Sequence, residues 1–462
     1  MKRRRPEFTC LALATAVALL SARPYADGFN DGSRLATVES LGERGTFCID
    51  DSLFVRPSFH PGRSNPYNPR IEGVRVVGTL DKVRIDGRFY SDKPPVPALL
   101  SGGCYRLWLD CGGAPARDAI GGFCYWWTVL ASGVPFAIAV FAMCRTARDL
   151  GFPPLWQLLF AASFAGCTLA LVYTRHLNGH IQLLATAAVV CWQLVRLAVD
   201  PSQTRLILMG ASAGLGFTLD LAIGPILFGL VLLAVVGTTR SIRSVGLFSA
   251  SALPFSALHF ALNYGLGSTF VPLGSVMEYL DYPDSAFGPH NATGNWKHGS
   301  ITAFAGYAFA LLFGERGFLA FHPTLWLALP AAVWLWLKAD RFRRIVLAIA
   351  ISWPLLSWAL YSATSNNHSG SCCSIRWFVP LLAPGYLTLG LLLKEHPRFR
   401  TDFLWLSAVG GAVTSKSFEG GPWEHISADE FVPTLAVGLA GWLAIRIADR
   451  ARRPMRNIQS TS

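Results

Sequence analysis

The chain has little charge for its length. Only 15% of its 462 residues are Asp, Glu, Lys or Arg, whereas 52% are hydrophobic. A soluble domain usually carries about a quarter charged residues. The shortage of charge therefore excludes one large soluble domain. It favours a membrane protein, in which apolar runs of about 18 or more residues cross the bilayer as helices.

Several binding motifs are also missing. The sequence has no P-loop and no Gly-x-Gly-x-x-Gly after a strand, which are the common phosphate-binding loops of nucleotide-dependent enzymes. It has no paired Cys-x-x-Cys spacing of the kind that holds structural zinc. Long low-complexity tracts and solenoid-like repeats are absent as well. These absences argue against a nucleotide-binding domain and against a repeat protein.

The net charge of +12 does not indicate nucleic-acid binding, because the basic residues lie between apolar runs and not on one soluble face. Every second connection between these runs is basic, as the positive-inside rule expects of cytoplasmic loops. Both chain termini are therefore predicted to be cytoplasmic. The basic connections contain Arg145, Arg148, Arg196, Arg205, Arg240, Arg243, Lys338, Arg341, Arg343, Arg344, Lys394, Arg398, Arg400 and the tail from Arg446 to Arg456.

The apolar runs predict an all-α, multi-pass integral membrane protein with about twelve transmembrane helices. The run Phe8–Ala22 follows a basic cap and is interpreted as an uncleaved first helix, with a cleaved signal peptide as the alternative. The other predicted spans are 120–143, 153–173, 179–198, 203–219, 222–237, 244–264, 317–337, 344–362, 376–393, 401–415 and 430–447.

The remaining segments are predicted to be extracytoplasmic. The longest is the first loop, residues 23–119, whose part Pro95–Asp110 is expected to be a helix lying in the membrane interface. Four shorter segments face the same side: 173–180, 265–316, 361–375 and 415–430. We divide the chain into a catalytic region, residues 1–395, and a C-terminal pair of helices with a basic tail, residues 396–462.

Two acidic positions in the first loop are candidates for chemistry, because an acid near a membrane surface needs solvent or a partner. Asp31 could take a proton from a hydroxyl or amine acceptor. Its alternative role is to cap a helix, since Gly32-Ser33-Arg34 and an apolar periodic run follow it.

The segment Asp92-Lys93-Pro94-Pro95 is the second candidate. The prolines fix an extended backbone and prevent a helix from starting earlier. Lys93 would then be a point charge suited to phosphate, and Asp92 could ligate a divalent cation or hold the lysine. The alternative is an ordinary interfacial turn with a snorkelling lysine.

These pieces resemble the first extracytoplasmic loop of polyprenyl-phosphate-dependent GT-C glycosyltransferases, the group of the protein O-mannosyltransferases and lipid A aminoarabinose transferases. The loop matches are Asp31, Arg34, Ala36, Asp86-Gly87, Tyr90 and Asp92-Lys93-Pro94-Pro95. Further matches follow in order: Asn178-Gly179-His180, Gly314-Glu315-Arg316-Gly317-Phe318, His322-Pro323, Ser369-Gly370, Arg376-Trp377 and Pro380. The resemblance extends to about residue 395.

The resemblance implies a role for each matched side chain. Asp31 would be the catalytic base or orient the acceptor, while Lys93, Arg34 and Arg376 would hold the donor phosphate. Asp92 would meet the phosphate or a metal. Many relatives have a second acid where this chain has Gly32, and some have an acid where it has Asn178 or His180. A divalent cation therefore stays an open expectation. For His180 and His322 we weigh a metal or substrate role against simple hydrogen bonding.

The predicted function is transfer of a sugar from a polyprenyl-phosphate carrier to an extracytoplasmic lipid, glycan or protein acceptor. A single displacement would invert the anomeric centre. The bilayer is the other expected partner, most simply the bacterial inner membrane, and nucleic acid is not expected. One alternative is a transporter or flippase, for which Asp220 is the main acid near a helix break. The other is an inactive scaffold of the same fold.

Overall fold

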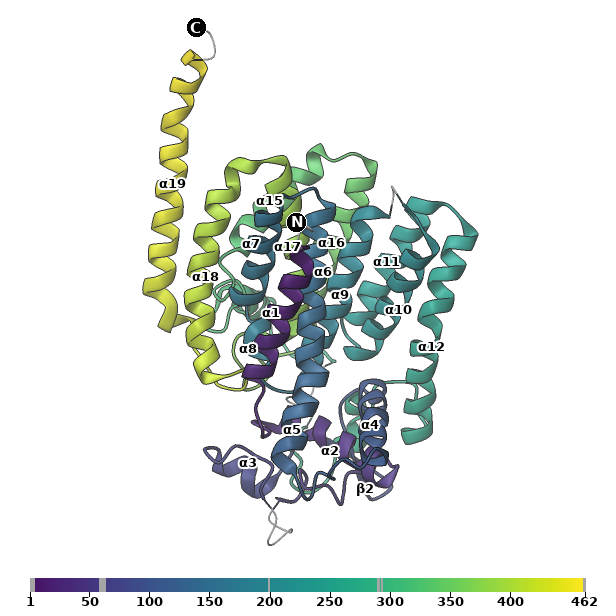
Figure 1. The fold of residues 1–462 in the computed structure, drawn as a ribbon. Coiled ribbons are helices and arrows are strands. Elements are labelled where there is room, and N and C mark those ends of the chain that lie inside the picture. The colour runs from purple at the N-terminus through teal and green to yellow at the C-terminus, as the bar shows by residue number, and fades with distance from the viewer. Residues whose placement is uncertain (1–4, 58–63, 198–199, 289–290, 292–293, 460–462) are drawn as a thin grey trace.

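The computed structural model describes residues 5–57, 64–197, 200–288, 291 and 294–459, with side chains described as far as residue 449. Long apolar helices lie side by side in one bundle (Figure 1). The helices of the bundle are α1 (Pro6–Ser21), α5 (Ile120–Thr128), η2 (Val129–Gly133), α6 (Val134–Asp149), α7 (Pro154–Gly166), α8 (Ala170–Tyr173), α9 (Gly179–Arg196), α10 (Gln203–Leu219), α11 (Gly224–Thr239), α12 (Ile242–Gly267), α14 (Ile301–Phe313), α15 (Leu325–Lys338), α16 (Arg341–Thr364), η4 (Arg376–Leu381), α17 (Leu382–Glu395), η5 (Pro397–Phe399), α18 (Arg400–Gly420), η6 (Ala428–Phe431) and α19 (Val432–Gln459).

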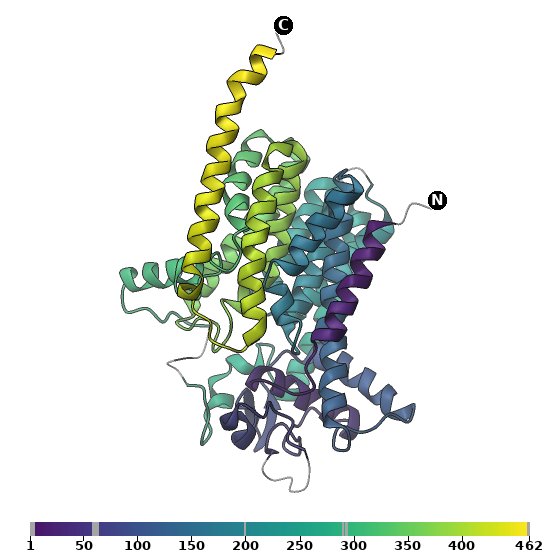
Figure 2. The same cartoon turned by 60° about the vertical axis from the view of Figure 1, so that its left-hand side comes forward.

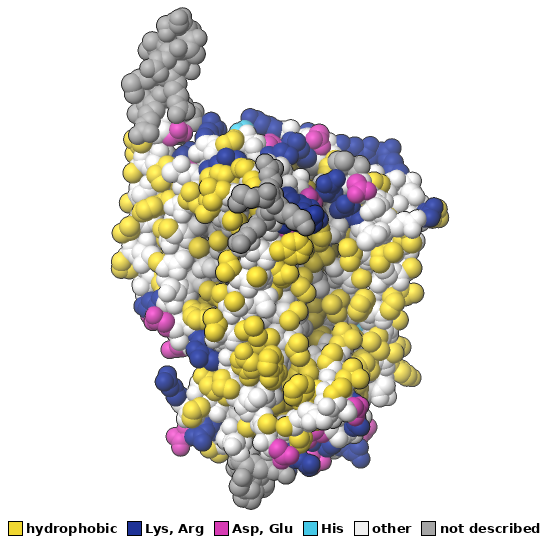
Figure 3. Space-filling model, viewed as in Figure 1, with side chains coloured by type: hydrophobic (Ala, Val, Ile, Leu, Met, Phe, Trp, Pro, Cys, Tyr) yellow, Lys and Arg dark blue, Asp and Glu magenta, His cyan; other side chains and the backbone are white. Residues whose placement is uncertain are grey.

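Length and composition identify five helical stretches that can cross a membrane within the described chain. They are Ile120–Asp149, Ile242–Gly267, Arg341–Thr364, Arg376–Glu395 and Ala428–Asp449. Shorter apolar helices accompany them, and a broad band of hydrophobic side chains covers the middle of the face in Figure 3. Lysine and arginine gather at one edge of that band. The chain is thus a helical integral membrane protein, as the shortage of charge predicted.

The observed helices differ from the predicted spans at several places; in the predicted span 317–337, for example, helix α15 begins only at Leu325. The predicted span 153–173 is divided into α7 and α8, because the helix stops at Gly166 and restarts at Ala170. The segment 265–316, predicted to be extracytoplasmic, contains one further apolar helix, α14, where no helix was predicted. This helix packs on α16, where Trp358 Nε1 donates to the Ala308 carbonyl at 2.8 Å. With 13 residues, α14 is too short for an 18-residue window to detect.

A smaller layer covers one end of the bundle, shown at the bottom of Figures 1 and 2. It contains α2 (Phe29–Arg44), α3 (Glu72–Val77), β1 (Lys82–Ile85), β2 (Arg88–Ser91) and α4 (Pro95–Asp110), with η3 (Leu273–Ser275) and α13 (Met277–Leu280) from a later segment. Its core is separate from that of the bundle. Leu35, Phe54, Tyr67, Tyr105 and Phe123 are among its buried side chains. The layer therefore has apolar packing of its own to hold polar residues in place.

The two strands form an antiparallel hairpin around Asp86-Gly87. Both turn residues have positive φ, 49° and 80°, as a type I′ turn requires. The register pairs Ile85 with Arg88 and Lys82 with Ser91. The residues just outside the hairpin, Asp81 and Asp92, are therefore brought opposite each other.

Helix α4 begins directly after this hairpin. Pro94 has an extended ψ of 132°, and Pro95 occupies the first helical turn, where its missing N–H leaves no hydrogen bond unmade. The helix expected over Pro95–Asp110 is thus present with those bounds. Lys93 is held between a strand and a helix start.

The chain begins and ends at the same end of the bundle. Helix α1 starts, and α19 extends outward, at the end opposite α2–α4 (Figures 1 and 2). The basic residues of the predicted cytoplasmic loops Arg145, Arg205 and Arg343 belong to helix ends there.

Candidate functional site

The first loop folds back so that its early and late parts touch. Ser33 Oγ on α2 lies 2.6 Å from Ser91 Oγ on β2, across 58 positions of sequence. The Thr79 hydroxyl donates to the Phe29 carbonyl at 2.7 Å, just ahead of the hairpin. These contacts place Arg34 and Lys93, from the two ends of the loop, in one region.

Lys93 is held by two carboxylates. Its Nζ lies 2.6 Å from Asp81 Oδ2 and 2.8 Å from Asp92 Oδ2, and each of the three side chains is 14% exposed. The backbone N–H of Lys93 donates to Ser91 Oγ at 3.1 Å, which fixes the start of the lysine. A lysine held on both sides has little freedom to leave, so its charge is fixed at this point.

The shared lysine affects the two carboxylates differently. Burial raises the pKa of Asp92 above its ordinary value, because Lys93 offsets only part of the lost solvation. Burial acts in the same direction on Asp81, but Lys93, Arg376 and Arg34 together hold the pKa of Asp81 below its ordinary value. Asp81 is therefore the firmer partner of the lysine.

The side chain of Arg34, which comes from α2, packs against the beginning of α9. A Cβ added to Gly179 would approach Arg34 Nη2 to 2.9 Å, so glycine at this position lets the guanidinium pack against the helix N-terminus. Arg34 Nε donates to Asn30 Oδ1 at 3.4 Å. Burial lowers the pKa of Arg34 to about 10, and the side chain stays charged at neutral pH.

Arg34 and Lys93 line a narrow cavity of about 10 Å³, which is room for about one water molecule. Its other walls come from α2, the start of α4 and the start of α9, namely Thr37, Val38, Ser91, Pro94, Pro97, Ala98, Ser101, Leu177 and Gln182. The Asp31 carboxylate is not part of this lining. The cavity thus brings two cationic groups together with apolar side chains from α2, α4 and the start of α9.

Arg376 approaches the same region from η4. Its charge contributes to the pKa values of Arg34 and Asp81, so the three groups lie within electrostatic range. Its Cζ lies 5.4 Å from the ring centre of Trp423, and its buried Nε has no hydrogen-bond partner among the described residues. Neither Arg34 nor Arg376 has an ion pair within the described part of the chain, although Asp92, Asp81 and Asp220 lie within electrostatic range of Arg34.

A second cluster of polar side chains lies within electrostatic range of Arg34, Lys93 and Arg376. His180 Nδ1 is 3.6 Å from Asp220 Oδ2, and the Tyr361 hydroxyl lies 3.1 and 3.2 Å from the two oxygens of Asp220. The tyrosine ring stacks on Trp377 at 4.2 Å, one residue after Arg376. Asp220, which sequence reasoning considered for a transporter, therefore belongs to the end of the bundle that carries Arg34.

Asp31 lies in the first turn of α2, three residues before Arg34. Its carboxylate accepts the backbone N–H groups of Asp27, Gly28 and Gly32 at 2.9, 2.9 and 3.1 Å. His176 Nδ1 lies 3.2 Å from Oδ2, and the Asp31 residue is only 1% exposed. Asp31 thus caps the helix from its third position, which is the kind of role the alternative interpretation expected.

The missing second acid has a steric explanation. A Cβ on Gly32 would lie 2.4 Å from the Tyr67 hydroxyl, which donates to the Phe54 carbonyl at 2.6 Å. No larger side chain fits there without displacing a buried tyrosine. The space that an acidic side chain at position 32 would need is therefore occupied here by the side chain of Tyr67.

Two other predicted residues have local structural contacts. Asn178 caps α9 by accepting the His180 N–H at 2.8 Å, and its buried Nδ2 has no partner among the described residues. His322 is fully buried in the bundle, where Nε2 accepts the Leu169 N–H at 3.2 Å and Nδ1 is 2.8 Å from the Phe318 carbonyl. The structure thus brings Asn178 close to the candidate site and leaves His322 within the core.

A divalent cation would have few ligands here. In the described ranges, no three His, Cys, Asp or Glu side chains come together as a metal site would require. Asp81 and Asp92 would have to hold it, and one buried oxygen, Asp92 Oδ1, has no hydrogen-bond partner among the described residues. The Lys93 ammonium already lies between these carboxylates, where such a cation would bind.

Sequence reasoning missed four residues of this region: Asp81, His176, Tyr361 and Trp423. Asp81 had a usable signal, because an Asp-Gly turn at 86–87 predicts a hairpin whose register places residue 81 opposite residue 92. The other three had none. Each is brought in by packing between helices that are distant in the sequence.

No known protein-family profile and no curated protein sequence matches the chain. Solved structures do match. The crystal structure of ArnT from Cupriavidus metallidurans bound to undecaprenyl phosphate aligns with a TM-score of 0.51 at 15% identity, covering 96% of this chain and 76% of that one. The apo crystal structure of the same ArnT aligns with a TM-score of 0.53 at 15% identity, covering 87% of this chain and 62% of that one.

At this level of identity the similarity shows a shared fold. ArnT is an aminoarabinose transferase of the GT-C type. The GT-C resemblance inferred from the loop motifs is therefore confirmed for the fold, over almost the whole chain.

Proposed function

We propose that this chain, which has the fold of a GT-C glycosyltransferase, moves a sugar from a polyprenyl-phosphate carrier to an acceptor outside the cytoplasm. The acceptor is a lipid, a glycan or a protein. Both termini are then cytoplasmic, and the layer of α2–α4 faces the other side of the bacterial inner membrane. The similarity to an ArnT that was crystallised with undecaprenyl phosphate supports this choice of carrier.

One observation carries the proposal. Arg34 and Arg376 are partly buried, lie within electrostatic range of each other, and have no ion pair within the described chain. Asp92, Asp81 and Asp220 act on Arg34 from a distance, and an anion bound directly between the two guanidinium groups would offset their mutual repulsion more fully. The phosphate of a lipid carrier supplies such an anion.

Lys93 adds a third, fixed cation. Asp81 and Asp92 hold its ammonium at the cavity, so Lys93 can stabilise the negative charge that develops on the phosphate as the sugar leaves. His180, next to Asp220 and Tyr361, offers polar contacts for the sugar or the acceptor. We keep a divalent cation at Asp81 and Asp92 as an added possibility that a chelator can test.

Asp31 is the proposed base of a single displacement that inverts the anomeric carbon. In this role it takes the acceptor proton while the acceptor oxygen or nitrogen bonds to the sugar and the carrier phosphate departs. Three backbone N–H groups already donate to this carboxylate. To act as the base, one of its oxygens must give up such a hydrogen bond and contact the hydroxyl or amine of the sugar acceptor instead. Asp92, Asp81 and Asp220 are other carboxylates within electrostatic range of Arg34.

The experiment is a transfer assay with purified membranes and radiolabelled polyprenyl-phosphate sugars, with and without chelator. We expect transfer by the unchanged chain and a loss of at least tenfold in Arg34→Gln and Arg376→Gln, the effect of removing about 1.4 kcal/mol of binding. Arg398→Gln, an exposed arginine at the other end of the bundle, is the matched control. Absence of transfer with every carrier sugar, or full activity in both site variants, would refute the proposal.

A further inference from the structure

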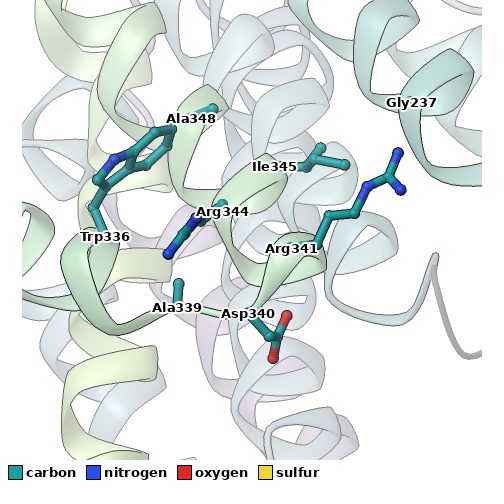
Figure 4. Close-up of a pocket in the computed structure, with 8 residues that line it drawn as sticks. All are labelled: Gly237, Trp336, Ala339, Asp340, Arg341, Arg344, Ile345 and Ala348. Atoms are coloured by element: carbon teal, nitrogen blue, oxygen red, sulfur yellow. The ribbon is translucent and has the colours of Figure 1, made fainter.

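A groove lies at the other end of the bundle, between the ends of α11, α15 and α16 (Figure 4). Its volume is about 590 Å³. Eight residues line it: Gly237, Trp336, Ala339, Asp340, Arg341, Arg344, Ile345 and Ala348. None of them belongs to the candidate site, and the proposed transfer reaction uses none of them.

The position of the groove follows from α16. Arg341 begins this helix, and Tyr361, which contacts Asp220, lies near its other end. At 1.5 Å of rise per residue, about 30 Å of helix separates them. The hydrocarbon core of a bilayer is about 30 Å thick. The groove therefore lies at the surface of the leaflet opposite the candidate site.

Both arginines that line the groove lack an ion pair among the described residues. The acid beside them is already occupied, because Asp340 accepts the Arg343 N–H at 2.9 Å and lies 3.4 Å from Arg343 Nε. Arg343 in turn pairs with Glu395 at 2.6 Å. Arg341 and Arg344 are exposed and make no ion pair in the portion of the chain that the structure covers. Their two charges are available to a ligand from outside.

The walls of the groove are apolar. Trp336 and Ile345 form opposite sides, with Ala339 and Ala348 between them (Figure 4). Gly237 closes the far end, where Ile345 Cδ1 lies 3.6 Å from the place of a glycine Cβ. In the same view Arg344 points toward Trp336, and Arg341 extends toward α11. Charge at the rim and apolar walls below it suit a molecule with an anionic head and a hydrocarbon chain.

We propose that this groove binds an anionic glycerophospholipid of the adjacent leaflet. The phosphate binds Arg344 beside Trp336, Arg341 adds positive charge toward α11, and the upper part of one acyl chain lies along Trp336 and Ile345. Basic pockets between transmembrane helices bind such head groups, and tryptophan is favoured at this depth. Zwitterionic lipids bind more weakly, since their ammonium group is repelled by the two arginines. The site is independent of the proposed transfer.

The test is native mass spectrometry of the purified full chain with equal amounts of dioleoyl phosphatidylglycerol and dioleoyl phosphatidylcholine. We expect the unchanged chain to retain phosphatidylglycerol at least fivefold more often. The double variant Arg341→Gln/Arg344→Gln is expected to lose most of this preference, whereas Arg398→Gln, an exposed arginine at the same end, keeps it. Trp336→Ala is expected to reduce retention of both lipids.

Two further arms make the result decisive. Unfolding temperatures in phosphatidylcholine show whether the double variant is folded; if it is not, each single Gln variant is expected to show a partial loss of the preference. Soluble sn-glycerol 3-phosphate tests the head group alone. The proposal is overturned if the arginine variants keep the preference, if the control loses it equally, or if the soluble phosphate stabilises the chain as well as phosphatidylglycerol does.

Discussion

The arginines of the candidate site differ from its lysine in one respect. Lys93 has two carboxylates within 2.8 Å, whereas the structure gives Arg34 and Arg376 no such partner among the residues it describes. At the scale of single residues, the protein itself supplies the ion pairs of the lysine, whereas the two arginines are free to pair with a bound ligand. Substitutions at the two kinds of cation should therefore have different consequences. Loss of the lysine exposes two acids, while loss of an arginine weakens binding alone.

Asp31→Asn tests the two roles of this carboxylate. Asparagine has one acceptor oxygen, so its amide NH₂ would face at least one of the three backbone N–H groups. We expect the free energy of unfolding to fall by about 1–2 kcal/mol, measured by thermal unfolding in detergent. We also expect transfer activity to be lost at temperatures where the variant is folded.

Asp27→Asn is the matched control. The Asp27 carboxylate also lies beside His176, but it accepts none of the three backbone hydrogen bonds that Asp31 accepts. Full transfer activity in folded Asp31→Asn would remove the assignment of Asp31 as the base. Lost stability with unchanged activity would leave Asp31 with the capping role alone.

The carboxyl group of Glu39 makes the stability of the smaller layer, which contains α2–α4, depend on pH. Burial raises its pKa from the ordinary 4.5 to about 7, although the Ser52 hydroxyl and the Leu53 N–H donate to it and Arg44 lies 3.5 Å away. A raised pKa means that the folded state binds the proton more tightly than the unfolded state does. This stabilisation is complete below pH 4.5 and is lost as the pH rises through about 7.

We therefore expect stability to fall by up to about 3 kcal/mol between these limits from this group alone. Glu39→Gln is always neutral, and its unfolding temperature should vary less with pH over this range. Chemical unfolding followed at pH 5, 6, 7 and 8 measures the difference. Parallel profiles for the two proteins would contradict it.

At the scale of elements, apolar runs predicted the helices well and the short strands not at all. Helices α9, α10 and α11 follow the predicted spans closely because each is one uninterrupted apolar run. The strands have four residues each, too few for alternation to be seen. The hairpin nevertheless controls the site, since its register brings Asp81 to Lys93. Local pattern could predict Asp92 and Lys93, but only the register adds the second acid.

Gly87→Ala tests this dependence. Gly87 has a φ of 80°, and nothing lies within 4 Å of an added Cβ, so the change acts on the backbone alone. The left-handed backbone conformation is about 1 kcal/mol less favourable for a residue with a Cβ than for glycine. We expect the hairpin to loosen and the KM for the lipid-linked donor to rise severalfold with little change in kcat. Gly87→Asn tolerates positive φ and should be milder; equal effects of the two changes would contradict the backbone explanation.

At the scale of the whole molecule, the site is assembled from segments that the sequence does not connect. Tyr361 reaches Asp220 across 141 positions, and Arg376 reaches the first loop from much farther along the chain. Such contacts depend on how helices pack, which a single sequence does not encode in any short pattern. The family resemblance supplied Arg34, Lys93 and Arg376 as a set. It supplied nothing after residue 395, and the division of the chain at that point stays a prediction.

Trp423 shows how a later segment takes part. It follows α18, yet its ring lies against Arg376, 6.2 Å from the ring of Tyr173 and 3.4 Å from the place of a Cβ on Gly28. Trp423 therefore stands between the start of α2 and Arg376. Its buried Nε1 has no hydrogen-bond partner in the described residues. We infer that it holds the guanidinium in the orientation that meets the donor phosphate.

Trp423→Ala should release that guanidinium. A cation–π contact of a partly desolvated arginine is worth about 1–2 kcal/mol, so we expect the KM for the polyprenyl-phosphate sugar to rise about tenfold. Trp423→Phe keeps a ring over Arg376 and should recover most of the affinity. Combining Trp423→Ala with Arg376→Gln should add little to the Arg376 change alone, because both act on one contact. Additive effects would instead mean that Trp423 contacts the substrate by itself, and an unchanged KM in Trp423→Ala would remove the C-terminal segment from the site.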